Sequence, residues 1–287
     1  MRWMLYWRLM RFDKPIGILL LLWPTLCALC LASSGLPAMR ILLVFVLGVI
    51  LMRAAGCVIN DIAARHIDPH VKRTTGRPLA AGELTVRSAW IVFALLMLTA
   101  FCLVLSLNKT TIFLSFVGAF LAFIYPFSKR WFVMPQFVLG LAFSWGVPMA
   151  FSALLGRVPL LGWAAYGVSA LWALVYDTQY ALVDIEDDIK IGVYSTARLF
   201  GQYATYWIAF FQLLMLFCFL FLGHHLQYNA VYYFFIALVA ALMVYQQVSM
   251  HVGGRSACFQ AFINNHWVGL CVFCGIVSQY SFFIRWF

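Results

Sequence analysis

The carboxylates of this chain are concentrated in two short segments. Eight of the nine Asp and Glu residues lie in segments 61–83 and 177–188, and Asp13 is the ninth. Carboxylates that only made a membrane protein soluble would be scattered along it. Clustered like charges stay ionised together when cations lie between them. The two segments therefore predict a site that holds cations.

Helical spacing predicts that each segment presents its acids on one face. At 100° per residue, Asp177, Asp184 and Asp188 fall within about 40° of one another. Asp61 and Asp68 are seven residues apart and are likewise predicted to share a face. Each helix end would then carry a stripe of oxygen ligands. Alternatively, single acids are solvated or ion-paired, for example Asp61 with Arg65 one helical turn later.

These oxygen ligands are the kind that Mg²⁺ prefers, and Asn60 adds an amide oxygen to them. Mg²⁺ commonly completes its shell with water and substrate phosphates. Basic residues near both segments suit diphosphate oxygens. They are Arg11, Lys14, Arg65, Lys72, Arg73, Arg77, Lys129, Arg130 and Lys190.

The composition is that of an integral membrane protein. The chain has 287 residues, of which 65% are hydrophobic and 10% charged, and its mean hydropathy is +0.95. A soluble domain carries about 25% charged residues, so lipid must cover most of this surface. No segment alternates as a barrel strand does, which leaves helices as the spanning elements.

Nine apolar segments predict an all-α polytopic protein, a single domain over residues 1–287. A span needs about 20 apolar residues. The predicted spans are 16–33, 39–59, 88–107, 110–127, 133–153, 160–182, 203–222, 231–249 and 264–283. The start of the chain, with Trp3 and Trp7 among arginines, predicts an amphipathic helix ahead of the first span.

The Lys and Arg residues support this topology. Positive charge is enriched in cytoplasmic loops. Of the 19 basic residues, fourteen fall on the side of the N-terminus, four on the other side, and Arg53 lies within the second span. Both acidic segments fall on the N-terminal side, which we predict to be cytoplasmic, with the C-terminus outside. The net charge of +10 does not indicate nucleic-acid binding, because the basic residues are spread over short loops.

Two charged residues are predicted to lie deeper in the membrane. Arg53 is seven residues before Asn60 and so shares its helix face. A charge at this depth is usually functional, and we expect Arg53 to bind an acceptor carboxylate or a cavity acid, the alternative being a structural pair. Asp177 lies about two helical turns before Asp184 and is expected to orient or deprotonate an acceptor.

A diphosphate held by Mg²⁺ at the mouth of a lipid-lined cavity indicates a prenyl diphosphate substrate. At this point the sequence resembles the intramembrane prenyltransferases of the UbiA type, and their 4-hydroxybenzoate branch in ubiquinone biosynthesis in particular. The resemblance extends over nearly the whole chain. Its strongest blocks are 9–17, 22–25, 52–61, 70–74, 77–79, 125–130, 176–181, 183–192, 257–259 and 264–265.

The resemblance implies nine helices around a central cavity in the bacterial inner membrane. It also implies Mg²⁺ as cofactor and an electrophilic substitution that joins a polyprenyl group from its diphosphate to the ring carbon ortho to the phenol of 4-hydroxybenzoate. No protein partner is implied. Asp177 and Asp184 are the expected catalytic residues. The implied Mg²⁺ ligands are Asn60, Asp68, Asp184 and Asp188.

One position departs from the family pattern. The first motif of the family has an aspartate four residues after its asparagine, and this chain has Ala64 there. We hypothesise that Asp61 supplies the missing oxygen; otherwise water fills the vacancy and metal affinity falls. A catalytically impaired homologue and a prenyltransferase with another aromatic acceptor are the alternatives.

Two other classes fit the sequence less well. A secondary transporter would carry ionisable residues near the bilayer midplane, whereas these acids lie at one surface. A CDP-alcohol phosphotransferase would carry a compact Asp-x-x-Asp-Gly signature, which is absent from the sequence.

Overall fold

The computed structural model describes residues 2–71 and 74–280. All regular elements in these residues are helical, which confirms the predicted all-α class. In chain order they are α1 (Arg2–Leu9), α2 (Ile16–Ser33), α3 (Met39–Ala64), η1 (Asp68–His70), α4 (Val86–Val104), α5 (Lys109–Ser128), α6 (Pro135–Phe143), α7 (Gly146–Leu155), α8 (Leu160–Ile191), α9 (Thr196–Phe200), η2 (Gly201–Tyr203), α10 (Ala204–His225), α11 (Ala230–Val252) and α12 (Gly254–Val277).

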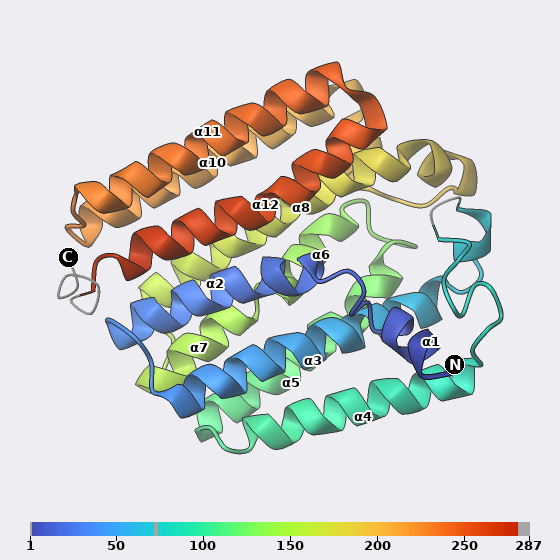
Figure 1. Ribbon diagram of the computed structural model, residues 1–287, viewed down its shortest axis with the longest axis horizontal. Coiled ribbons are helices and arrows are strands. Elements are labelled where there is room, and N and C mark those ends of the chain that lie inside the picture. The colour runs from blue at the N-terminus through green and yellow to red at the C-terminus, as the bar shows by residue number, and fades with distance from the viewer. Residues whose placement is uncertain (1, 72–73, 281–287) are drawn as a thin grey trace.

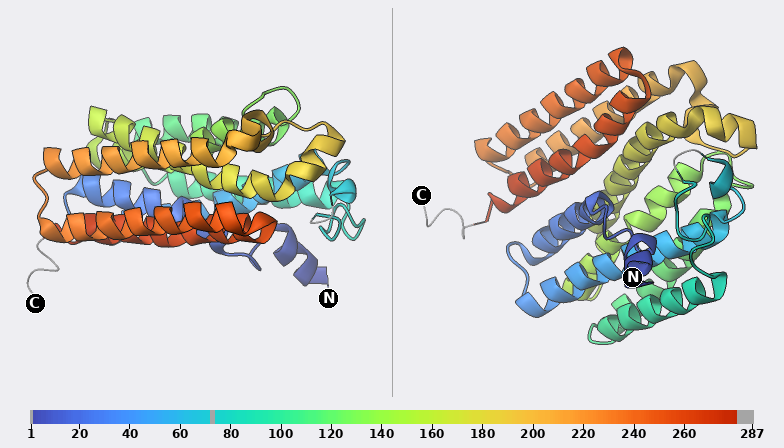
Figure 2. Two further views of the ribbon diagram at one scale, coloured as in Figure 1. Left: turned by 90° about the horizontal axis from the view of Figure 1, so that it is seen from above. Right: turned by 45° about the vertical axis from the view of Figure 1, so that its right-hand side comes forward.

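The long helices lie side by side in one bundle (Figure 1; Figure 2). Within the described residues, eight segments are long and apolar enough to cross a membrane, with α6 and α7 counted together. The helix α8 is not among the eight, but it packs in the bundle against α6, α10 and α12. With α8 included, the segments match the nine predicted spans in order. Large apolar side chains such as Phe113 and Leu213 project outward, as expected of a lipid-facing surface.

The fifth predicted span, 133–153, is two short helices rather than one continuous helix. The break falls at residues 144–145, between α6 and α7. Pro148 lacks the N–H that would bond to the carbonyl of Ser144, and its ring crowds that carbonyl, so an unbroken helix is disfavoured here. The predicted span is therefore confirmed as a pair of helices that together are long and apolar enough to cross a membrane.

The ninth predicted span was placed ten residues too late. We expected 264–283, whereas α12 runs over Gly254–Val277. Gly254 has a φ of +63°, a conformation that glycine adopts without strain, so the chain turns from α11 into α12 with no loop. The residues before Asn264, which the predicted span left out, are part of this helix.

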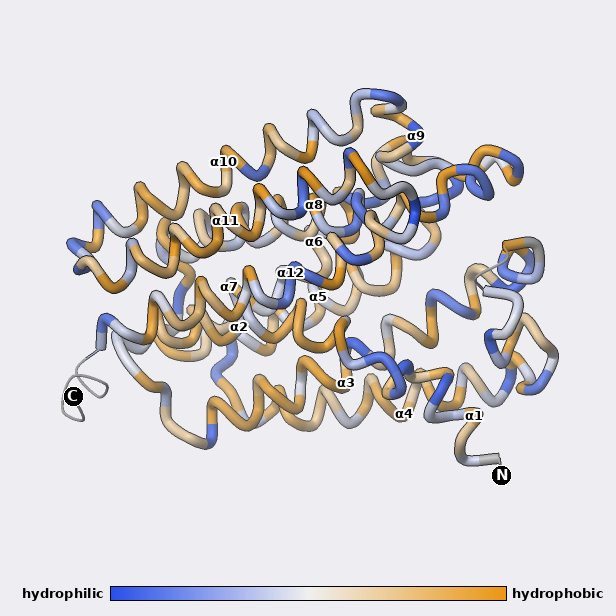
Figure 3. Tube along the Cα trace, turned by 45° about the horizontal axis from the view of Figure 1, so that its top comes forward, coloured by the Kyte–Doolittle hydropathy of each residue, from blue (hydrophilic) through white to orange (hydrophobic). Residues whose placement is uncertain are grey.

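Both acidic segments lie at the same end of the bundle. Residues 65–71 and 74–85, the C-terminal end of α8 and α1 are at one end, whereas α12 ends at the opposite one (Figure 1). Hydrophilic segments gather at the end with α1, and the helices are mainly hydrophobic (Figure 3). The arrangement confirms that the two segments share one side of the bundle.

The helix α1 is docked on this end as the amphipathic start predicts. Trp3 and Trp7 are exposed, while Leu9 is completely buried. Leu9 packs in a small cluster with Val58 and Ile62 of α3 and with Leu79. The anchored helix brings the residues that follow it, including Arg11, against the end of α3.

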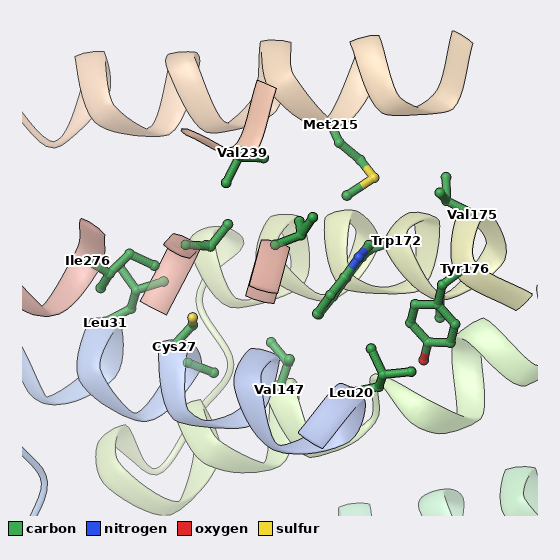
Figure 4. Close-up of a cluster of buried hydrophobic side chains, with 14 of the residues drawn as sticks. Leu20, Cys27, Leu31, Val147, Trp172, Val175, Tyr176, Met215, Val239 and Ile276 are labelled. Atoms are coloured by element: carbon green, nitrogen blue, oxygen red, sulfur yellow. The ribbon is translucent and has the colours of Figure 1, made fainter. Parts of the chain in front are cut away.

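The main core lies between α2, α8 and the α10–α12 layer. Leu20 and Cys27 of α2, Trp172 of α8 and Met215 of α10 meet in this cluster (Figure 4). Packing of this kind fixes the rotation of α8 about its axis, and α8 carries the second acidic segment.

A chain of buried amides also joins these helices. Gln179 of α8 donates to Gln246 of α11 at 3.0 Å, and Asn265 of α12 donates to Gln179 at 2.7 Å. Gln212 of α10 donates to Gln246 at 2.7 Å, and the Trp172 indole donates to Asn265 at 3.0 Å. Amides buried in an apolar bundle need such partners. The network therefore sets the register of α8 against its neighbours.

Candidate active site

The first acidic segment does not form the helical stripe that its spacing predicts. The helix α3 ends at Ala64, and Asp68 begins the 3₁₀ turn η1. The shared helix face of Asp61 and Asp68 was therefore a wrong prediction. The two carboxylates nevertheless come together, because Nη1 of Arg77 lies 3.2 Å from Asp61 Oδ1 and 2.7 Å from Asp68 Oδ2.

Asp61 is completely buried at the end of α3. Its Oδ1 also accepts a hydrogen bond from Nη2 of Arg11 at 2.9 Å, so it is shared by two guanidinium groups. Its Oδ2 is buried and has no hydrogen-bond partner among the described residues. The alternative pair of Asp61 with Arg65 is not seen in the described residues, and Nη1 of Arg65 instead donates to the carbonyl of Ile62 at 3.1 Å. One oxygen of Asp61 thus holds arginines, and the other has no partner.

Asp68 is a buried carboxyl whose charge needs support. Burial raises the pKa of this carboxyl above its ordinary value, and the nearby Asp61 acts in the same direction. The Arg77 guanidinium opposes both effects by favouring the ionised form. An additional cation beside Asp68 would also favour the ionised form of its carboxyl.

The second acidic segment forms the predicted stripe. The helix α8 continues to Ile191 and is capped by Gly192 with a φ of +78°. Asp177, Asp184 and Asp188 therefore share one helix face, and each is half-buried. Glu186 lies on another face, is exposed, and pairs with Arg255 of α12. The three aspartates of the predicted site and the surface residue Glu186 are therefore on different faces of α8.

Deeper in the bundle, charged and phenolic groups surround one region. Arg53 lies on α3 two turns before Asn60, as predicted, and both side chains are half-buried. The charges of Arg53 and Asp177 both act on the buried hydroxyls of Tyr125 and Tyr176. Arg53 and Asp177 therefore both lie close to these two phenols, and Asp177 is seven residues before Asp184 along α8.

The predicted basic residues fall into several groups. Arg11 and Arg77 hold Asp61, and Nη2 of Arg130 donates to the carbonyl of Ala63 at 2.7 Å. Arg65 and Arg130 therefore bond backbone carbonyls at the end of α3. The lysines of the group lie between α1 and α2, at the C-cap of α5 and in the last turn of α8; they are Lys14, Lys129 and Lys190. Lys72 and Arg73 lie outside the described residues.

The residues present fit Mg²⁺ by the chemistry of their donors. In the described parts of the chain no three acidic, Cys or His side chains converge closely enough to enclose a metal ion. Mg²⁺ is commonly held by one or two carboxylates together with substrate phosphates and water. Each motif offers such an incomplete set of oxygens, and within the described residues no donor forms a hydrogen bond with the buried Oδ2 of Asp61. A metal shared with a substrate fits this arrangement better than a metal enclosed by protein.

Two apolar cavities flank α2. The larger has a volume of about 710 Å³ and is lined by α2, α6, α8, α10 and α12, with Trp23, Trp172 and Leu174 in its wall. The smaller, about 500 Å³, lies among α2, α3, α4, α5 and the α6–α7 pair. The wall of the larger cavity includes α8 just before Asp177, so an apolar chain can lie there while its polar end is at the acidic motifs.

Several residues of the site region were not singled out from the sequence. They are Gly17 and Phe143 beside Arg53, and Gln179, Gln212 and Gln246 in the amide network. The glutamines carried a usable signal, because a polar residue inside an apolar span must find a buried partner. Gly17 and Phe143 carried no such signal, since small and aromatic residues are common in spans.

Known proteins resemble this chain over most of its length. Residues 21–269 match the UbiA prenyltransferase family. The 4-hydroxybenzoate octaprenyltransferase of Methylococcus capsulatus is 54% identical over 275 residues, which are 96% of this chain and 94% of that protein. The enzyme of the same name from Coxiella burnetii is 50% identical over 277 residues, 96% of each chain.

Solved structures share the fold. A UbiA homologue from Aeropyrum pernix, solved in its apo form, has a TM-score of 0.79 at 25% identity and covers 91% of this chain and 97% of its own. A UbiA homologue from Archaeoglobus fulgidus, solved with GPP and Mg²⁺ bound, has a TM-score of 0.69 at 17% identity, with 96% and 99% covered. The family match, the relatives and the helical bundle agree: the chain is an integral membrane protein and belongs to the UbiA prenyltransferase family.

Proposed function

We propose that the protein transfers a long polyprenyl group from polyprenyl diphosphate to the ring carbon ortho to the phenol of 4-hydroxybenzoate. Diphosphate is released, and the product is an intermediate of ubiquinone biosynthesis. The observation that carries this proposal is the placement of both acidic segments at one end of an apolar bundle. The relatives named 4-hydroxybenzoate octaprenyltransferase support the same substrates.

The diphosphate would bind between the two acidic motifs. The residues that would hold Mg²⁺ are Asn60, Asp68, Asp184 and Asp188. Because position 64 is alanine rather than aspartate, Asp61 would contribute its Oδ2 as a further ligand. A Mg²⁺ ion held by these residues would supply positive charge against the departing diphosphate. The predicted basic residues would add cationic donors to the diphosphate oxygens. They are Arg11, Lys14, Arg65, Arg77, Lys129, Arg130 and Lys190, together with Lys72, which is predicted from the sequence alone.

The apolar part of the substrate would lie in the larger cavity beside α8. The C1–O bond of the allylic diphosphate breaks with the electron pair going to oxygen, and this leaves an allylic cation. The lining of Trp23, Trp172 and Leu174 excludes water, which would otherwise capture the cation as an alcohol. The tail is thereby kept dry while its reactive end faces the acceptor.

The acceptor would bind between Arg53 and Asp177. The Arg53 guanidinium would pair with the carboxylate of 4-hydroxybenzoate and set the orientation of the ring. The ring carbon ortho to the phenol attacks the allylic cation, and loss of the ring proton restores aromaticity. Asp177 would orient or deprotonate the phenol, which would make the ring more nucleophilic.

We also propose that the end with both motifs faces the cytoplasm in a bacterial inner membrane. The fourteen-to-four distribution of basic residues supports this orientation. The N-terminus would be cytoplasmic and the C-terminus outside.

Membranes that contain the protein should form prenylated 4-hydroxybenzoate with Mg²⁺ and none with EDTA, when given a long polyprenyl diphosphate. An Ala64→Asp variant should reach half-maximal activity at lower Mg²⁺, because the added carboxylate restores a ligand oxygen. Product formation is measured by chromatography across a Mg²⁺ titration. Activity in the variant but none in the wild type would instead identify the protein as a catalytically impaired homologue, a candidate that Ala64 specifically favours.

Asp177→Asn should lower kcat by about 10²- to 10⁴-fold, since the amide cannot accept the proton. The KM for polyprenyl diphosphate should stay near the wild-type value, because Asp177 lies away from the helix end that binds the diphosphate. Steady-state kinetics on both substrates measure the effect. Asp13→Asn, which changes an exposed acid between α1 and α2, is the matched control. Unchanged turnover in Asp177→Asn would rule out this role.

A further inference from the structure

Gly17, in the first turn of α2, lies directly under the guanidinium of Arg53. A β-carbon placed on Gly17 would be only 2.6 Å from Cζ of Arg53, and closer still to Nε and Nη2. By contrast, a β-carbon on Gly48, which is on the same helix as Arg53, would meet nothing within 4 Å. The missing side chain of Gly17 is therefore the space that the guanidinium occupies.

The backbone does not require glycine at position 17. Gly17 is not among the residues with positive φ, so any residue could adopt its conformation. Glycine is also one of the poorest helix formers. Neither local conformation nor helix propensity explains the residue, and the contact with Arg53 does.

An aromatic ring also lies close to the guanidinium. Cζ of Arg53 lies 5.6 Å from the centroid of Phe143, at the end of α6, within the range of a cation–π contact. Gly17 of α2 and Phe143 of α6 thus form a seat for the guanidinium of Arg53, which contacts bare backbone and a ring.

This seat leaves the charge of Arg53 available to a ligand. Among the described residues, no Asp or Glu oxygen lies within 4.0 Å of its nitrogens. Neither Gly17 nor Phe143 offers a side-chain acceptor. An arginine that is half-buried in an apolar bundle without an acidic partner is set to receive an anion.

We propose that Gly17 is a positioning residue for acceptor binding: by lacking a β-carbon, it seats the Arg53 guanidinium against α2 in the orientation that binds the carboxylate of an aromatic acid. This inference rests on the proposed role of Arg53 in acceptor recognition. A methyl group at position 17 would push the guanidinium off its seat. Only the end of a flexible side chain has to move, so the helix itself should remain folded.

The test compares the KM for 4-hydroxybenzoate in the wild type, Gly17→Ala, Arg53→Met and the double variant. Gly17→Ala should raise this KM by about tenfold or more, the cost of misplacing a charged hydrogen bond, and leave the KM for polyprenyl diphosphate within about twofold of the wild type. Arg53→Met should raise the acceptor KM at least as much. The double variant should match Arg53→Met, because no guanidinium remains to be displaced.

Gly48→Ala is the matched control and should behave as the wild type, since its new methyl group meets open space. Equal thermal unfolding midpoints would confirm that each variant is folded. A wild-type acceptor KM in Gly17→Ala, or additive effects in the double variant, would overturn the inference while the proposed reaction stands. An unchanged acceptor KM in Arg53→Met would overturn the inference together with the proposed role of Arg53.

Discussion

Asp184→Asn should reduce kcat/KM for prenyl transfer by about a thousandfold or more, the scale of losing a main electrostatic contact in the transition state. Asp184 lies on the face of α8 that also carries Asp177 and Asp188, and it is half-buried. An amide keeps the shape of the side chain but removes the negative charge that a cation at the diphosphate needs. The effect should therefore appear in catalysis and in Mg²⁺ dependence, with the protein still folded.

Glu186→Gln is the matched control, because it makes the same change two residues away on another face of α8. Glu186 is exposed and pairs with Arg255, and exposed ion pairs contribute little, about 0–1 kcal/mol. Kinetics of both variants over a range of Mg²⁺ concentrations measure the difference. If Glu186→Gln lost as much activity as Asp184→Asn, the loss would reflect damage to the end of α8, and the assigned role of Asp184 would be wrong.

The difference between the two acidic segments shows what the sequence was able to predict. Helical spacing gave the correct face for Asp177, Asp184 and Asp188 because α8 runs without a break to Ile191. The same reasoning failed for Asp61 and Asp68, because α3 ends between them. Periodicity is informative only while one element continues, and it does not report where that element ends.

The spacing of residues along the sequence could not predict which residues join distant segments. Arg77 brings Asp61 and Asp68 together through a loop, and the sequence identified it only as one of many nearby basic residues. The seat of Arg53 combines Gly17 and Phe143 from two other helices. Charge and hydropathy patterns predicted the helices and their common end, whereas these pairings depend on how the helices pack.

Arg77→Met should lower the free energy of unfolding by about 3–5 kcal/mol, the usual cost of leaving a buried charge without its partner. Asp61 and Asp68 are both buried and both contact Nη1 of Arg77, whose own side chain is 13% exposed. Without the guanidinium, Asp68 keeps the desolvation that already raises its pKa and loses the cation that opposes this. Thermal unfolding can be followed by thiol labelling, because Cys27, Cys30 and other cysteines are buried in the fold.

Two further variants separate the ion pair from other effects of the arginine side chain. Arg8→Met breaks the exposed Arg8–Glu83 pair at the same end of the bundle and should change stability by less than about 1 kcal/mol. Arg77→Met/Asp68→Asn should recover part of the loss, since Asp68 no longer carries a charge without its guanidinium, while Asp61 keeps its pair with Arg11. If the double variant were no more stable than Arg77→Met, Arg77 would act through packing. Recovery would mean that a guanidinium links the two acids of the first motif before any metal binds. Arg77 would then leave Asp61 Oδ2 as the oxygen that is available to compensate for Ala64.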